Sequence, residues 1–108
     1  MPTRPAAARL LALALPEAIE APHFQYASFR VGGKIFATLP PEGQHLHVFV
    51  ADDERDQALA LAAECVEKLL WGGKVVGLRV ALAQAPPALV KRLLAQAWAR
   101  KAPKRLRP

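Results

Sequence analysis

A chain of 108 residues is long enough for one folded domain, and its 53% of hydrophobic and 22% of charged residues exclude a disordered protein. The single cysteine, Cys65, excludes a disulfide framework, and the apolar run at residues 10–15 is too short for a secretory core or a membrane span. We therefore expect one cytoplasmic domain, residues 1–108, with no segment in a membrane.

The charges are divided unevenly along the chain. All nine acidic residues lie between Glu17 and Glu67, whereas ten of the 15 lysines and arginines follow Glu67. The net charge of +6 therefore comes from an acid-free C-terminal part, whose local field attracts polyanions. This distribution predicts a nucleic acid or another polyanion as a partner.

The first third of the chain predicts a helix followed by a hairpin. Pro5 suits the first turn of a helix over residues 5–15, and Pro16 ends it. Residues 17–27 are irregular or a short edge strand, because Pro22 cannot donate a hydrogen bond to a neighbouring strand. Residues 28–31 and 34–39 are strands, and the pair Gly32-Gly33 joins them as a hairpin turn.

The rest of the chain alternates between strands and helices. Residues 40–43 form a turn, and 45–50 alternate as a third strand. Acidic residues at 52–56 begin a second helix, whose apolar stripe, including Cys65 as a small buried side chain, extends to about residue 70, where WGG ends it. Residues 74–82 are a fourth strand, and a last amphipathic helix follows the prolines at 86–87. We find no internal repeat.

Three helices and four or five short antiparallel strands predict a two-layer α+β domain. Each strand has one apolar face, so the helices pack on one side of the sheet and leave the other side open. We place the candidate sites on this fold.

The glycine pair is a turn rather than a phosphate loop, because it joins strand to strand instead of strand to helix. A two-residue turn would pair Val31 with Lys34 and place Arg30 on the apolar side with Ile35. A three-residue loop with a bulge at Gly33 would place Arg30 and Lys34 on the polar face together. Hydrophobic patterning favours the bulged loop.

The open face of the sheet is the first candidate site. Strand alternation gathers there Ser28, Arg30, Lys34, Phe36, Thr38, His45, His47, Phe49 and Arg79. Basic and aromatic side chains mixed on an open sheet are typical of platforms that stack single-stranded nucleic acid. The alternative is a face covered by the tail or by a second subunit, with Phe36 and Phe49 packing against the partner.

The last helix and a basic tail at about residues 100–108 are the second candidate site. Their cations can neutralise phosphates without reading bases, and those that we select are Lys91, Arg92, Arg100, Lys101, Lys104 and Arg105. The alternative for the tail is a solubilising frayed end.

The sequence offers little for catalysis or metal binding. His45 and His47 share a strand face, but no third ligand stands at suitable spacing, so we interpret them as two surface histidines. None of the few hydroxyls lies in a nucleophile-elbow context. We expect no enzymatic activity, no metal and no cofactor, and the sequence identifies no small-molecule substrate.

The segments HF…SFRVGGKIFATL (23–39), LRV (78–80) and AWARKAPKRL (97–106) resemble the MmcQ/YjbR-like family, as does the opening ALALPEAIE. The resemblance implies a fold similar to that of CyaY and frataxin, in small bacterial proteins without an established enzymatic role. Such proteins are commonly labelled DNA-binding, with a "double wing" motif. Two features depart from the family pattern: the segment around Trp71 is compressed, and the first helix has no acid, so iron binding is not implied.

The function that we predict is nucleic-acid binding, to DNA first of all, through phosphate contacts. Arg30, Lys34, Arg79 and the cations of the last helix and tail would make these contacts. The alternative is a protein-interaction module, with a protein partner or a second copy of the chain on Phe36 and Phe49.

Overall fold

The computed structural model describes residues 2–107, which fold into helices and strands in two layers. The first half comprises α1 (Pro5–Leu13), β1 (Ile19–His23), β2 (Tyr26–Val31), β3 (Lys34–Leu39) and β4 (His45–Val48). The second half comprises α2 (Asp52–Leu61), β5 (Val66–Trp71), β6 (Lys74–Ala81) and α3 (Pro87–Lys101), with short 3₁₀ turns η1 (Leu82–Gln84) and η2 (Lys104–Leu106).

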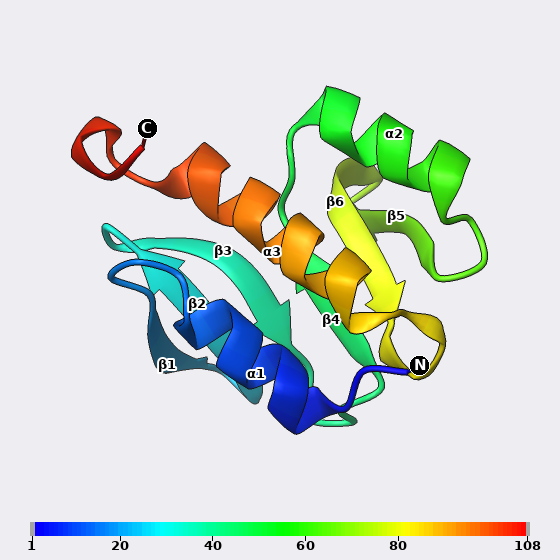
Figure 1. Ribbon diagram of the computed structural model, residues 1–108, viewed down its shortest axis with the longest axis horizontal. Helices are drawn as coiled ribbons and strands as arrows, with labels where there is room; N and C mark the ends of the chain where they lie inside the picture. The colour runs from blue at the N-terminus through cyan, green and yellow to red at the C-terminus, as the bar shows by residue number, and fades with distance from the viewer. Residues whose placement is uncertain (1, 108) are drawn as a thin grey trace.

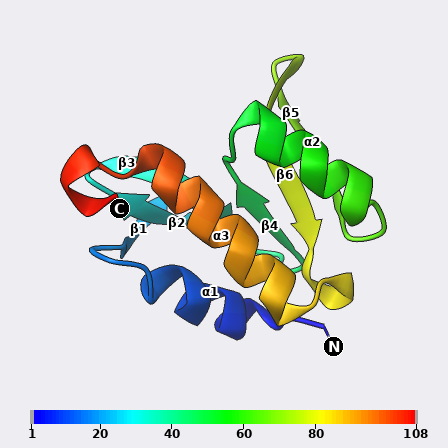
Figure 2. The ribbon, with the colours of Figure 1, turned by 45° about the horizontal axis from the view of Figure 1, so that its top comes forward.

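The strands form one antiparallel sheet in the order β1-β2-β3-β4-β6-β5. Helices α1 and α3 lie side by side and α3 packs against β3, whereas α2 lies against β5 and β6 (Figures 1 and 2). All three helices cover the same face, so the two-layer α+β prediction is confirmed. The sheet has six strands rather than four or five. No helix in residues 2–107 is long and apolar enough to cross a membrane.

Two segments account for the larger number of strands. The sequence pattern left the first undecided and predicted a helix for the second. The edge strand considered for residues 17–27 is present as β1, whereas the predicted second helix ends at Leu61 and its expected last turns form β5. Val66 and Leu69, three residues apart, follow the helical period and lie on opposite faces of the strand, so pairing with β6 and not the local pattern makes this segment a strand. The WGG segment is therefore a hairpin turn, not the end of a helix.

The loop between β2 and β3 has two residues, so the prediction of a three-residue bulged loop was wrong. Gly32 and Gly33 have φ values of 57° and 79°, typical of a tight type I′ turn, and Val31 pairs with Lys34. A bulge does occur, but within β3, where Phe29 pairs with Ala37 and Arg30 pairs with Ile35.

The bulge reverses the faces expected for residues 34–36, whereas residues 37–39 keep theirs. Phe36, the extra residue, is fully buried in the core, whereas Ile35 lies opposite Arg30 on the side away from the helices. Phe36 was predicted on the open face as a stacking or partner-binding residue, and that placement was wrong.

The two hairpins share one geometry, although we find no internal repeat in the sequence. Residues 29–37 and 69–77 both contain a Gly-Gly turn with positive φ, a lysine after it and a register shift at the same position. The second hairpin presents equivalent residues to the opposite face, because β3 and β6 flank β4 and both run antiparallel to it. Val31 is thus fully buried, whereas its equivalent Trp71 is 48% exposed.

The core lies between the sheet and the helices. Its largest fully buried side chains include Phe29, Phe36, Leu46, Leu78, Leu93 and Leu94. The tail is part of this packing: Ala102 is buried and Leu106 packs against the core, so the described part of the tail is not frayed. Pro108, the last residue of the predicted tail, lies outside the described residues.

Candidate functional site

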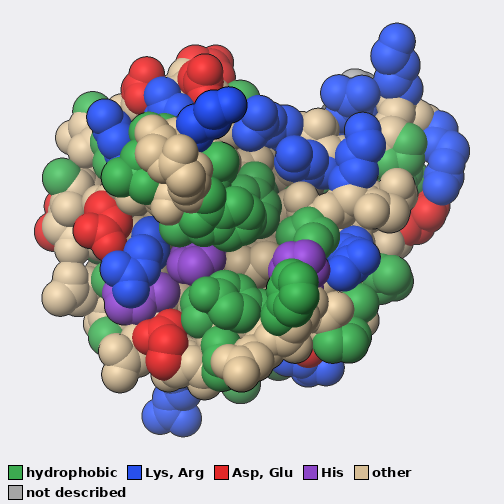
Figure 3. All heavy atoms as spheres, turned by 180° about the vertical axis from the view of Figure 1, so that it is seen from behind, with side chains coloured by type: hydrophobic (Ala, Val, Ile, Leu, Met, Phe, Trp, Pro, Cys, Tyr) green, Lys and Arg blue, Asp and Glu red, His purple; other side chains and the backbone are tan. Residues whose placement is uncertain are grey.

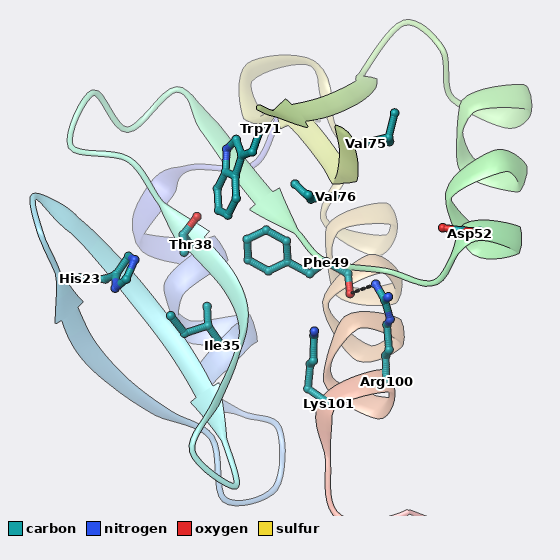
Figure 4. Close-up of a pocket in the computed structure, with 10 residues that line it drawn as sticks. All are labelled: His23, Ile35, Thr38, Phe49, Asp52, Trp71, Val75, Val76, Arg100 and Lys101. Carbon is teal, nitrogen blue, oxygen red and sulfur yellow. Dashed lines mark hydrogen bonds between the residues drawn. The ribbon is translucent and has the colours of Figure 1, made fainter. Parts of the chain in front are cut away.

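The sheet opens between its two halves, and this opening creates a pocket on the open face. Only two residue pairs, Ala37 with Val48 and Thr38 with His47, join β3 to β4. The N–H of Phe49 still donates to the carbonyl oxygen of Phe36 at 3.1 Å; after Phe49 the chain leaves the sheet towards α2, and the two halves diverge. The resulting pocket has a volume of about 420 Å³ (Figure 4).

Gly77 allows the chain to leave β4 at this point. A Cβ on Gly77 would overlap the carbonyl oxygen of Val48 and lie 3.2 Å from Cα of Phe49. At the end of α3, Nη1 of Arg100 donates hydrogen bonds to the carbonyl oxygens of Val50 (2.8 Å) and Phe49 (3.3 Å), which have left the sheet. The position of Phe49 is therefore fixed by a close backbone contact and by α3.

The pocket has one apolar wall and one mixed wall. Phe49 is 8% exposed and meets Trp71 edge to face, with ring centroids 5.3 Å apart. Val75 and Val76 lie on the Trp71 side, while Ile35, Thr38 and His23 line the wall formed by the first strands (Figure 4).

One end of the pocket is cationic. Figure 4 shows the amine of Lys101 directed towards the pocket beside Arg100, both from the end of α3. Burial lowers the pKa of Lys101 below its ordinary value, and the neighbouring Arg100 and Lys34 lower this pKa further. The one acidic residue at the rim, Asp52, is paired with Arg55 at 3.0 Å. An anion bound at this end would offset the repulsion around Lys101.

Four of the selected cations gather around this end of α3. The turn of the first hairpin packs against the segment after α3, because a Cβ on Gly32 would lie 3.0 Å from Cδ of Pro103. We call this surface the cationic corner and define it as Lys34, Arg100, Lys101 and Lys104. Within residues 2–107, none of the four forms an ion pair with an acidic side chain.

The surface view shows how the corner relates to the pocket. On the face away from the helices, hydrophobic side chains gather at the centre with histidines beside them, and lysines and arginines run along the upper edge (Figure 3). Apolar and cationic surfaces are thus adjacent on one face.

The other cations predicted to contact phosphates are bound to other side chains or lie far from this end of α3. Arg79 pairs with Glu67 at 2.8 Å, Arg105 forms a double hydrogen bond with Glu17 at 2.8 Å, and Nε of half-buried Arg30 donates to Ser28 at 3.0 Å. Lys91 and Arg92 are exposed on α3, but Lys91 lies about 15 Å from Lys101 along the helix. The structure therefore brings together only part of the predicted set.

The predicted stacking set is not assembled as expected. His47 is buried and joined to Thr38 by a hydrogen bond of 3.3 Å, and His45 lies 3.2 Å from Glu42 and 3.3 Å from Arg79. Of the predicted aromatic pair only Phe49 reaches the open face. Sequence reasoning missed Trp71 as its neighbour, although Trp71 precedes Gly-Gly-Lys just as Val31 does.

The environment of His47 makes a pH dependence of stability measurable. Burial lowers the pKa of His47, and the charges of Arg79 and His45 add to this effect. The unfolded chain then binds more protons than the folded one below the ordinary histidine pKa of about 6.5, so the free energy of unfolding should fall as pH drops through that value. Urea unfolding at about pH 7.5 and about pH 5.5 measures this loss. His47→Gln should show a smaller loss, and an equal loss would contradict the assignment.

The remaining groups to consider are the cysteine thiol and the side chains that could bind a metal ion. Burial raises the pKa of the Cys65 thiol, which donates a hydrogen bond to the carbonyl oxygen of Gln84 at 3.0 Å. Among residues 2–107, no three His, Cys, Asp or Glu side chains gather closely enough to hold a metal ion.

Comparison with known proteins gives two matches of different kinds. The model of the YjbR family matches residues 13–100. The crystal structure of Deinococcus radiodurans protein DR2400, with a domain designated DUF419, is similar in fold, with a TM-score of 0.71 and 18% sequence identity over 85% of this chain and 73% of that one. No curated protein matches the chain.

Proposed function

Because the chain belongs to the YjbR family, for which the sequence resemblance implies DNA binding, we propose that this protein is a non-enzymatic nucleic-acid-binding protein that holds phosphates at the cationic corner. One observation carries the proposal: Lys34, Arg100, Lys101 and Lys104 gather at one end of α3 without an acidic partner among residues 2–107.

The chemistry of the corner suits phosphates rather than bases. Its cations come from a hairpin turn, a helix end and the tail, so they can follow a backbone of regularly spaced charges. Such contacts are tolerant of sequence, and their strength falls with salt because binding releases counterions from the nucleic acid. We expect binding with little sequence preference.

A salt titration tests this proposal. Fluorescence anisotropy with a short mixed-sequence DNA duplex, between about 50 and 200 mM salt, should give log K against log salt a slope of about −3 to −4, as four phosphate contacts predict. Weak binding at low salt, or a slope near zero, would overturn the proposal.

A pair of double variants locates the contacts. Lys34→Gln with Lys104→Gln should reduce the magnitude of the slope by about 2, since each lost phosphate contact contributes about 0.9. Lys91→Gln with Arg92→Gln removes the same charge from the other end of α3 and is expected to change the slope little. Equal effects of the two pairs would show that net charge, not the corner, determines binding.

A protein-interaction module remains the second candidate, and one observation favours it. Leu70 is 58% exposed and Trp71 is 48% exposed on the second hairpin, which offers apolar anchors in place of the buried Phe36. If the partner is a second copy of the chain, sedimentation should show a concentration-dependent dimer that Leu70→Ala with Trp71→Ala abolishes. A monomer at all concentrations would exclude that partner.

A further inference from the structure

The pocket between the two halves of the sheet combines two chemistries that rarely occur together by packing alone. One side presents the half-exposed indole of Trp71 above Phe49 and beside Val75 and Val76. The other end presents the ammonium group of Lys101 and the guanidinium of Arg100 (Figure 4). A matching ligand has a flat apolar part joined to an anion.

We infer that this pocket takes one unpaired nucleobase of a single-stranded nucleic acid, stacked on Trp71, while the adjoining phosphate lies at Lys101 and Arg100. The inference rests on the proposed function, because it gives the strand held at the cationic corner a point where one of its bases enters the protein.

The walls suit a base. An exposed aromatic face stacks any base, because every base has a π-face. His23, on the opposite wall, offers a ring nitrogen that can meet the edge of a base. The volume of about 420 Å³ lies within the range of small-ligand sites.

The cationic end suits the phosphate. Lys101 is half-buried among cations, so it gains more from an anion than a fully exposed lysine would. Asp52 at the rim would repel an anion on its side of the pocket, which leaves the end near Lys101 for the phosphate. Lys101 also belongs to the cationic corner, so a strand can pass from the corner into the pocket without interruption.

The pocket should distinguish single strands from duplexes. In a duplex each base is stacked and paired, and it must be unstacked before it can enter. A single strand presents bases without that penalty. The corner holds both forms through phosphates, whereas the pocket adds affinity only for the single strand.

Trp71 is the residue to substitute, and its fluorescence is the signal that reports binding. Trp98, the second tryptophan, is 7% exposed and donates through Nε1 to the carbonyl oxygen of Pro16, so its fluorescence should be insensitive to ligands. Titration with a thymidine strand of about 12 nucleotides should quench the fluorescence of Trp71, and Trp71→Ala should lower the affinity for that strand about tenfold. The same variant should leave the affinity for a duplex unchanged.

Leu70→Ala is the matched control. Leu70 is a neighbouring exposed apolar residue on the same strand that does not line the pocket, so its loss should leave both affinities unchanged. Far-UV circular dichroism establishes that each variant is folded before binding is compared. An equal loss of single-strand affinity in both variants would overturn the inference.

Titrations with small ligands identify what occupies the pocket. Thymidine 5′-monophosphate should quench Trp71 more weakly than the strand, thymidine without phosphate more weakly still, and Lys101→Gln should remove the difference between these two. Quenching by the mononucleotide but not by the strand would overturn the inference and make a free nucleotide the occupant.

The two proposals can fail separately. If the corner variants reduce the salt slope but Trp71→Ala changes no affinity, base capture is wrong and phosphate binding stands. If neither duplex nor strand binds with salt dependence, the proposed function is wrong, and base capture is wrong with it.

Discussion

Gly77→Ala is expected to lower the free energy of unfolding by about 3 kcal/mol, the upper part of the range for an overpacked interior. The new methyl group would overlap the carbonyl oxygen of Val48 and lie 3.1 Å from its carbonyl carbon and 3.2 Å from Cα of Phe49. These are backbone atoms between two elements, so they cannot move aside as the end of a flexible side chain could. Urea unfolding monitored by circular dichroism measures the loss.

Gly73→Ala is the control for this substitution. Gly73 has a φ of 79° and nothing within 4 Å of an added Cβ, so alanine there suffers backbone strain but no overlap. Its expected loss is about 1 kcal/mol. If Gly77→Ala lost no more than Gly73→Ala, the close approach of β4 to β6 would not be the reason for a glycine at residue 77.

Phe36→Ala is expected to lower the free energy of unfolding by about 4 kcal/mol, because it removes a fully buried aromatic ring and leaves a cavity. Phe36 occupies the bulge of β3 and faces the helices, so the loss falls on the core rather than on a surface. Thermal or urea unfolding of the purified variant measures it.

Phe24→Ala is the control for Phe36→Ala, because it makes the same substitution at the surface. Phe24 is 93% exposed at the turn between β1 and β2, and its loss should change the free energy of unfolding by less than about 0.5 kcal/mol. If Phe36→Ala were instead as stable as Phe24→Ala and had lost affinity for a partner, Phe36 would be an interface residue and the packing described for β3 would be wrong.

The elements that could be predicted are those that local chemistry determines. Pro5 and Pro16 delimit α1 closely, the glycine pair determines the first hairpin, and alternation identifies β4. β5 could not be predicted, because Val66 and Leu69 follow the helical period and pairing with β6 depends on the tertiary structure. The face of Phe36 was predicted wrongly for another reason: one extra residue in a strand reverses the side chains on one side of it, here residues 34–36, and no residue in KIFATL marks the bulge.

The candidate site, too, could be predicted only in part. Charge counting selected Arg100, Lys101 and Lys104, and strand alternation selected Lys34; these four do gather. It could not show that Arg105 would meet Glu17, which lies at the other end of the chain. Trp71 was missed because the apolar stripe predicts a helix that WGG ends, whereas these residues form the second hairpin.

The short junction between β3 and β4 also bears on how the molecule folds. β1, β2 and β3 pair within residues 19–39 through two-residue turns, whereas β4 pairs with β3 at only two positions and takes most of its pairing from β6, about thirty residues further along. Closing such a long loop loses chain entropy before any contact forms, so the β1–β3 meander can form first and α3 can lock the two halves together last. The pocket takes residues from the first strands, the second hairpin and the end of α3. It therefore exists only when all three are in place, and chains in which one of them has not yet packed do not have it.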